Sequence, residues 1–162
     1  MIELSNDLIN SCYQFAIKVT DTTFENYKSR NLYLTKEKAI NDAFKSKLTE
    51  WYSYFFLVSR GKIVKEPCMK ILPSHKKSFE ADLEIIGHGI GIHIKACKPD
   101  FHSVLFERSE VNFILKQKNQ FIMIIEYTSP KEMKMLSIRH ASDHKYLPPK
   151  NSNLTTKLAI YL

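Results

Sequence analysis

Apolar residues recur every three or four positions near the start of the chain, which is the spacing of one face of an α-helix. The series consists of Leu4, Leu8, Ile9, Cys12, Phe15, Ala16 and Val19. Ser5 or Asn6 suits the start of this helix, because a short polar side chain accepts a hydrogen bond from the first turn. Residues 20–34 are polar and aromatic without a clean period, so we expect a loop or a broken helix there.

A second, longer helical pattern covers residues 36–59, with Thr35 as its cap and Gly61 as its stop. Its predicted buried stripe is Ala39, Ile40, Ala43, Phe44, Leu48, Trp51, Phe55 and Val58. Glu50 falls at the edge of this stripe. Either it is a boundary residue that faces water, because burying an unpaired carboxylate is costly, or it has the site role that a family resemblance described below implies.

The C-terminal half contains patterns typical of strands. Residues 120–127 hold a continuous apolar run, as in a strand that is buried on both faces, and residues 133–139 alternate. A turn over residues 128–132 joins them, and residues 157–162 form a final short strand. Helices followed by strands predict an α/β fold with a central mixed β-sheet flanked by helices.

The stretch from Glu80 to Lys95 predicts a β-hairpin with one apolar and one polar face. If His88-Gly89 is a two-residue loop, Asp82 lies opposite Lys95, and Glu84 lies opposite His93. Alternate side chains point to opposite faces, so these four residues share one face. The other face then carries Leu83, Ile85, Ile92 and Ile94.

Two explanations fit this polar face. Opposite charges across a ladder are common on solvated sheets and contribute only about 0.2–1 kcal/mol. Alternatively, two carboxylates can hold a hard divalent cation such as Mg²⁺, while a nearby lysine stabilises charge on a phosphate.

Asp82 followed by His93-Ile-Lys95 resembles the active-site hairpin of the PD-(D/E)XK nucleases, which have the restriction-endonuclease-like fold. In that family an acidic residue ends one strand, and an acid-x-Lys triplet lies on the next. The resemblance covers roughly residues 35–162. It implies a single nuclease-like domain over residues 1–162, with a helical extension over 1–34 and a core over 35–162.

The chain departs from the family pattern at His93, which stands where the family has Glu or Asp. This change removes one negative charge from the metal site, and Glu84 is the expected replacement. The family also carries an acidic residue on an early helix that reaches the metal site, and Glu50 is the best match. The resemblance thus implies that Asp82, with Glu50 or Glu84, holds Mg²⁺ or Mn²⁺, and that Lys95 orients or activates a water. His93 is then a metal ligand, an orienting residue or a general base.

A net charge of +7 favours a polyanionic partner, and nucleic acid is the usual one. The most basic segment precedes the hairpin and includes Lys76 and Lys77; it is either a phosphate-binding rim or a solvated loop. By resemblance, the segment after the hairpin adds three further phosphate contacts, namely Lys98, His102 and Arg108.

Three widely spaced cysteines without a C-x-x-C pair indicate a reduced, cytoplasmic setting. The first residues show no pattern of a signal peptide, and the longest apolar run, residues 51–58, is too short to cross a membrane. The short, lysine-rich chain suggests a phage or mobile-element protein, which would act in the host cytoplasm.

The sequence thus predicts a metal-dependent DNA endonuclease. A double-strand cutter with one site per chain would act as a homodimer. Two alternatives stay open: a nuclease-fold protein that binds nucleic acid without cleaving it, and a protein-interaction or inhibitor module.

Overall fold

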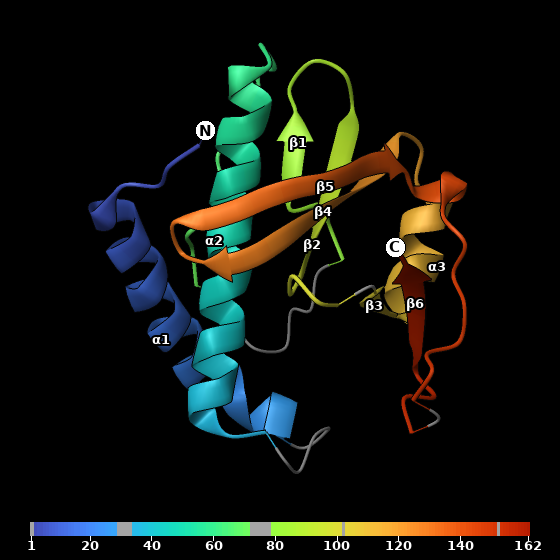
Figure 1. Cartoon of the computed structure of the whole chain (residues 1–162), viewed down its shortest axis with the longest axis horizontal. Coiled ribbons are helices and arrows are strands. Elements are labelled where there is room, and N and C mark those ends of the chain that lie inside the picture. Colours follow the sequence, from blue (N-terminus) through green and yellow to red (C-terminus); the bar gives the residue numbers. More distant parts are fainter. Residues whose placement is uncertain (1, 29–33, 72–78, 102, 152) are drawn as a thin grey trace.

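The structure of the protein is a computed structural model that describes residues 2–28, 34–71, 79–101, 103–151 and 153–162 (Figure 1). The elements in chain order are α1 (Asn6–Lys28), α2 (Lys36–Ser59), β1 (Leu83–Ile85), β2 (Ile90–Cys97), β3 (Ser103–Glu107), α3 (Arg108–Lys116), β4 (Gln120–Ser129), β5 (Glu132–His140), the 3-10 turn η1 (Ala141–Asp143) and β6 (Lys157–Tyr161). None of the described helices is both long and apolar enough to cross a membrane.

The central sheet has the strand order β1-β2-β4-β5. Strand β2 pairs antiparallel with β1 and parallel with β4, and β4 pairs antiparallel with β5. The predicted α/β class with a mixed sheet is therefore confirmed. Parallel neighbours require a crossover, and here β3 and α3 lie in the connection between β2 and β4. Strand β3 pairs with β6 in a separate two-stranded sheet.

Both faces of the central sheet are covered. Helix α2 packs on one face, and α1 packs on α2 (Figure 1). The core on the α2 side contains Tyr52, Leu57, Val64, Leu83, Ile85, Ile92, Ile94, Met123 and Ile125. The core on the opposite side contains Cys97, Val104, Phe106, Val111, Ile114, Ile122, Ile124, Ala141 and Ile160. Alternate residues of β4 belong to opposite cores, which explains its continuous apolar run.

Helix α1 is longer than predicted. The Ser5 hydroxyl accepts a hydrogen bond from Leu8 N–H (3.2 Å), so Ser5 is the cap. The expectation of a loop or broken helix was wrong for residues 20–28, while residues 29–33 lie outside the described part of the chain. The hydroxyls of Thr22 and Thr23 bond to carbonyls one turn earlier, so the helix itself satisfies these polar side chains.

Helix α2 has the predicted ends, but its first and second halves bury different faces. Thr35 accepts a hydrogen bond from Lys38 N–H, and Gly61 follows the helix with a φ of +74°. Leu48 packs against α1, whereas Tyr52 and Leu57 pack against the sheet. The prediction was wrong for Phe55 and Val58, which are exposed, because the second half of the helix has a different packing partner.

The hairpin register differs from the prediction by two residues. Leu83 pairs with Ile92 and Glu84 with Gly91, so the expected Glu84–His93 and Asp82–Lys95 pairs were wrong. The loop has four residues, Ile86 to Gly89, because Gly87 and Gly89 adopt positive φ values that extend the turn. A shift of two residues keeps every side chain on its predicted face.

Helix α3 was missed, because the sequence pattern predicted no helix or strand over residues 108–116. The helix has only nine residues and buries just Val111 and Ile114, which lie three positions apart. Such a short pattern carries little periodic signal.

Replacing the α2 cap tests how the helix start contributes to stability. We expect Thr35→Ala to lower the free energy of unfolding by about 1 kcal/mol, because Lys38 N–H loses its acceptor. Urea unfolding followed by circular dichroism measures the change. Thr35→Ser keeps the acceptor and serves as the matched control; an equal loss in both variants would contradict the capping role.

Candidate active site

Asp82 lies directly before β1 and is tied to the centre of β2. One of its carboxylate oxygens accepts a hydrogen bond from Ile94 N–H (2.7 Å). Asp82 as a residue is exposed, although protein atoms surround its carboxyl group. Burial of the carboxyl group raises its pKa, while the Ile94 amide and the nearby His93, Lys95 and Lys47 act in the opposite direction. Asp82 is thus held beside the two residues that the sequence placed with it.

Glu50 is buried on α2, with 8% of its surface exposed, so the alternative that it faces water was wrong. Burial raises the pKa of Glu50 to about 7; the Lys47 charge opposes this increase, and the Asp82 charge adds to it. The two carboxylates of the predicted metal site are therefore near enough to interact. Glu50 comes from a helix, and Asp82 comes from the residue before a strand, more than thirty positions later.

Lys47 is a buried cation that the sequence analysis missed. Its ammonium forms an ion pair with Glu50, donates to Cys68 O (2.9 Å) and lies 4.7 Å from the centre of the Phe15 ring. An ionised carboxylate is costly to bury unless a partner of opposite charge offsets its loss of hydration. The sequence did contain a signal for this ion pair. A lysine and a glutamate three positions apart on a helix are neighbours on its surface.

His93 is almost fully buried and is held by Gln120, the first residue of β4. His93 Nε2 lies 2.8 Å from Gln120 Oε1, while Gln120 Nε2 donates to Lys118 O (3.1 Å). The amide therefore presents its oxygen to the imidazole, so Nε2–H of His93 is the donor. Gly91 makes this contact possible, since a Cβ there would lie 2.5 Å from Gln120 Oε1. His93 Nε2 is thus engaged within the protein.

Lys95 is held by α3. Its ammonium contacts both carboxylate oxygens of Glu110, at 2.9 and 3.1 Å, and lies 4.4 Å from the centre of the Phe106 ring. About a quarter of the lysine side chain is exposed. The sequence analysis missed Glu110 because it missed α3. The contact fixes the ammonium on the polar face of β2, where solvent still reaches it.

The predicted phosphate contacts are only partly described. Lys98 and Arg108 are exposed, and Arg108 Nε donates to Thr155 O (3.1 Å). Lys76, Lys77 and His102 lie outside the described residues. Lys45 of α2, which the sequence analysis did not select, interacts electrostatically with Lys98.

The described residues supply only part of a binding site for a small divalent cation. Among the described residues, no three His, Cys, Asp or Glu side chains form a metal-binding group. Glu84 is exposed and lies opposite Gly91, so it does not replace the family carboxylate across from His93. Glu50 and Asp82 remain as a pair of carboxylates. Protein sites for Mg²⁺ commonly use one or two carboxylates, with waters and substrate phosphates completing the coordination.

Comparison of the chain with protein-family models, with curated proteins and with solved structures finds no match. Functional inference therefore rests on the chemistry of these side chains.

The raised pKa of Glu50 makes stability depend on pH. An unfolded glutamate loses its proton near 4.5, and folded Glu50 loses it at about 7, so the folded protein binds more protons between these values. Its free energy of unfolding should therefore fall as pH rises from about 4.5 to about 7. In metal-free buffer, we compare the free energies of unfolding of Glu50→Gln and the wild type. As the pH rises from 5 to 8, we expect the difference to change by on the order of 1–3 kcal/mol in favour of the variant.

Urea unfolding at the two pH values measures this difference. Glu132→Gln, at an exposed position on β5, shows the effect of removing a surface carboxylate. A difference between Glu50→Gln and wild type that stays the same at both pH values would contradict the burial argument.

Proposed function

We propose that the protein is a metal-dependent DNA endonuclease of the PD-(D/E)XK type, which hydrolyses phosphodiester bonds. The observation that carries the proposal is geometric: Asp82 is hydrogen-bonded to Ile94 N–H of β2, and buried Glu50 lies on α2, the helix that packs against β2. Burial and like charge both disfavour the ionised form of Glu50, and a divalent cation would relieve both effects. The resemblance of the Asp82–Lys95 hairpin adds the reaction class.

The fold supports this proposal in a second way. The polar hairpin residues remain on one face after the change of register, so Asp82, His93 and Lys95 stay grouped. Helix α2 packs on the opposite, apolar face of β2, and Asp82 interacts electrostatically with Lys47 of α2 as well as with His93 and Lys95. An acidic residue on an early helix was expected from the resemblance, and Glu50 occupies that position.

Glu50 and Asp82 would hold Mg²⁺ or Mn²⁺. When bound, such an ion polarises the phosphate and lowers the pKa of a coordinated water. His93 and Lys95 favour the ionised form of Asp82, which is the form that binds a cation. Lys95 would stabilise negative charge on the phosphate, and Glu110 keeps its ammonium oriented before substrate binds.

A second candidate function is nucleic-acid binding without cleavage. The contact of Lys95 with both oxygens of Glu110 favours it, because a substrate phosphate must compete with a carboxylate for the same ammonium. His93 in place of an acidic residue also weakens cation binding. The net charge of +7 serves either function.

Cleavage of supercoiled plasmid in Mg²⁺ or Mn²⁺ distinguishes the two functions. We expect Asp82→Asn and Lys95→Gln each to reduce the cleavage rate at least about 100-fold, because Asp82 would hold the metal ion and Lys95 would stabilise negative charge in the transition state. Nicked and linear products are quantified on agarose gels, with EDTA as the metal control. Glu132→Gln and Lys62→Gln, both exposed, are the matched charge controls.

Cleavage that persists in both site variants would overturn the assignment of the site. A plasmid that is retarded in the gel but stays intact in either metal would leave binding without cleavage as the function. Linear product formed without a nicked intermediate would indicate two copies acting together.

A further inference from the structure

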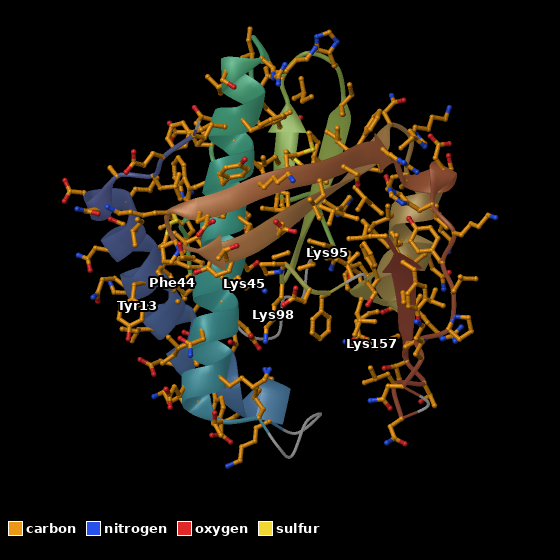
Figure 2. The ribbon with its side chains drawn as sticks, in the orientation of Figure 1. Tyr13, Phe44, Lys45, Lys95, Lys98 and Lys157 are labelled. Carbon is orange, nitrogen blue, oxygen red and sulfur yellow. The ribbon has the colours of Figure 1, made fainter. Side chains whose placement is uncertain are left out.

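A basic and aromatic surface lies next to the candidate active site. We call it the Lys45–Phe101 surface; it consists of Lys45 on α2 and of Lys98 and Phe101 in the turn after β2. In the view of Figure 2, Lys45, Lys95 and Lys98 lie between α2 and β6, and Lys45 interacts electrostatically with Lys98. Three residues of extended chain span about 10 Å, so the Cα atoms of Lys95 and Lys98 are at most about 10 Å apart.

The turn after β2 holds an aromatic ring in solvent. Phe101 N–H donates to Lys98 O (3.0 Å), which closes a four-residue turn with Pro99 in the second position. The Lys98 ammonium lies 5.9 Å from the centre of the Phe101 ring. Even so, 58% of Phe101 is exposed. A hydrogen-bonded turn thus presents a large apolar ring beside a cation.

Lys45 supplies a second cation from another element. Burial lowers the pKa of Lys45, Asp42 opposes this, and Lys98 adds to the decrease. Asp42 itself is bonded to Lys38 at 3.0 Å. None of the ion pairs among the described residues includes Lys45 or Lys98. Two neighbouring ammonium groups without a paired carboxylate favour an anion between them.

We propose that the Lys45–Phe101 surface binds single-stranded nucleic acid, with backbone phosphates at the two lysines and an unpaired base stacked on Phe101. Aromatic rings combined with cations are the features that bind single strands, because every unpaired base offers a face for stacking. In a duplex these faces are already stacked inside the helix. The inference rests on the proposed function, since the surface would deliver a single-stranded region to Lys95.

Binding is tested by fluorescence anisotropy with a labelled oligothymidylate of about 20 nucleotides and a duplex of equal length. EDTA is present, so that affinity is measured without cleavage. We expect tighter binding of the single strand. Phe101→Ala should weaken single-strand binding about tenfold and duplex binding much less, whereas Phe101→Tyr should retain the affinity.

The lysines are tested through salt dependence. Lys45→Gln and Lys98→Gln should each reduce the slope of log affinity against log salt concentration by about 0.7, the value for one phosphate contact on a single strand. Lys62→Gln and Ile63→Ala are matched controls, because both residues are exposed and follow the far end of α2. Neither control should change the affinity or the slope.

Equal affinity for single strand and duplex, or no effect of Phe101→Ala, would overturn the inference. This failure is separate from failure of the proposed function. Metal-dependent cleavage without single-strand preference would leave the nuclease assignment intact and remove the inference. Single-strand binding that depends on Phe101, in a protein that cleaves nothing, would support the inference and remove the nuclease assignment.

Discussion

The parallel pairing of β2 with β4 is the constraint on which the candidate site depends. It requires a crossover, and that crossover contains α3, which brings Glu110 to Lys95. Its register places Gly91 beside Gln120, and the missing Cβ lets the amide reach His93. One strand pairing therefore determines the partners of two predicted active-site residues. It also buries the centre of the sheet on both faces.

Charge compensation is the second principle of the site. Lys47 neutralises Glu50 inside the protein, and Glu110 neutralises Lys95 at the edge of solvent. Removing one member of a buried pair leaves an uncompensated charge, which typically costs several kcal/mol. Both pairs hold their side chains in place in the free protein. A ligand of Glu50 must therefore bind it more favourably than Lys47 does, and a ligand of Lys95 must bind it more favourably than Glu110 does.

Features that depend on local sequence were predictable, and features that depend on distant partners were not. The Thr35 cap and the Gly61 stop follow from local backbone geometry. The faces of the hairpin were correct because a shift of two residues preserves alternation, although the glycine turn changed the pairs. Gln120 and Glu110 were missed, since their roles arise only when β4 and α3 pack beside β2.

The packing of α1 on α2 has a consequence for local opening. Phe15 covers the Lys47 ammonium, and burial raises the pKa of the nearby Cys12 thiol to about 11. While α1 is docked, this thiol is inaccessible and protonated, and hence inert toward alkylating reagents. Release of α1 would expose the thiol and admit water to the Lys47–Glu50 pair together. The alkylation rate of Cys12 therefore reports how often this buried charge becomes hydrated.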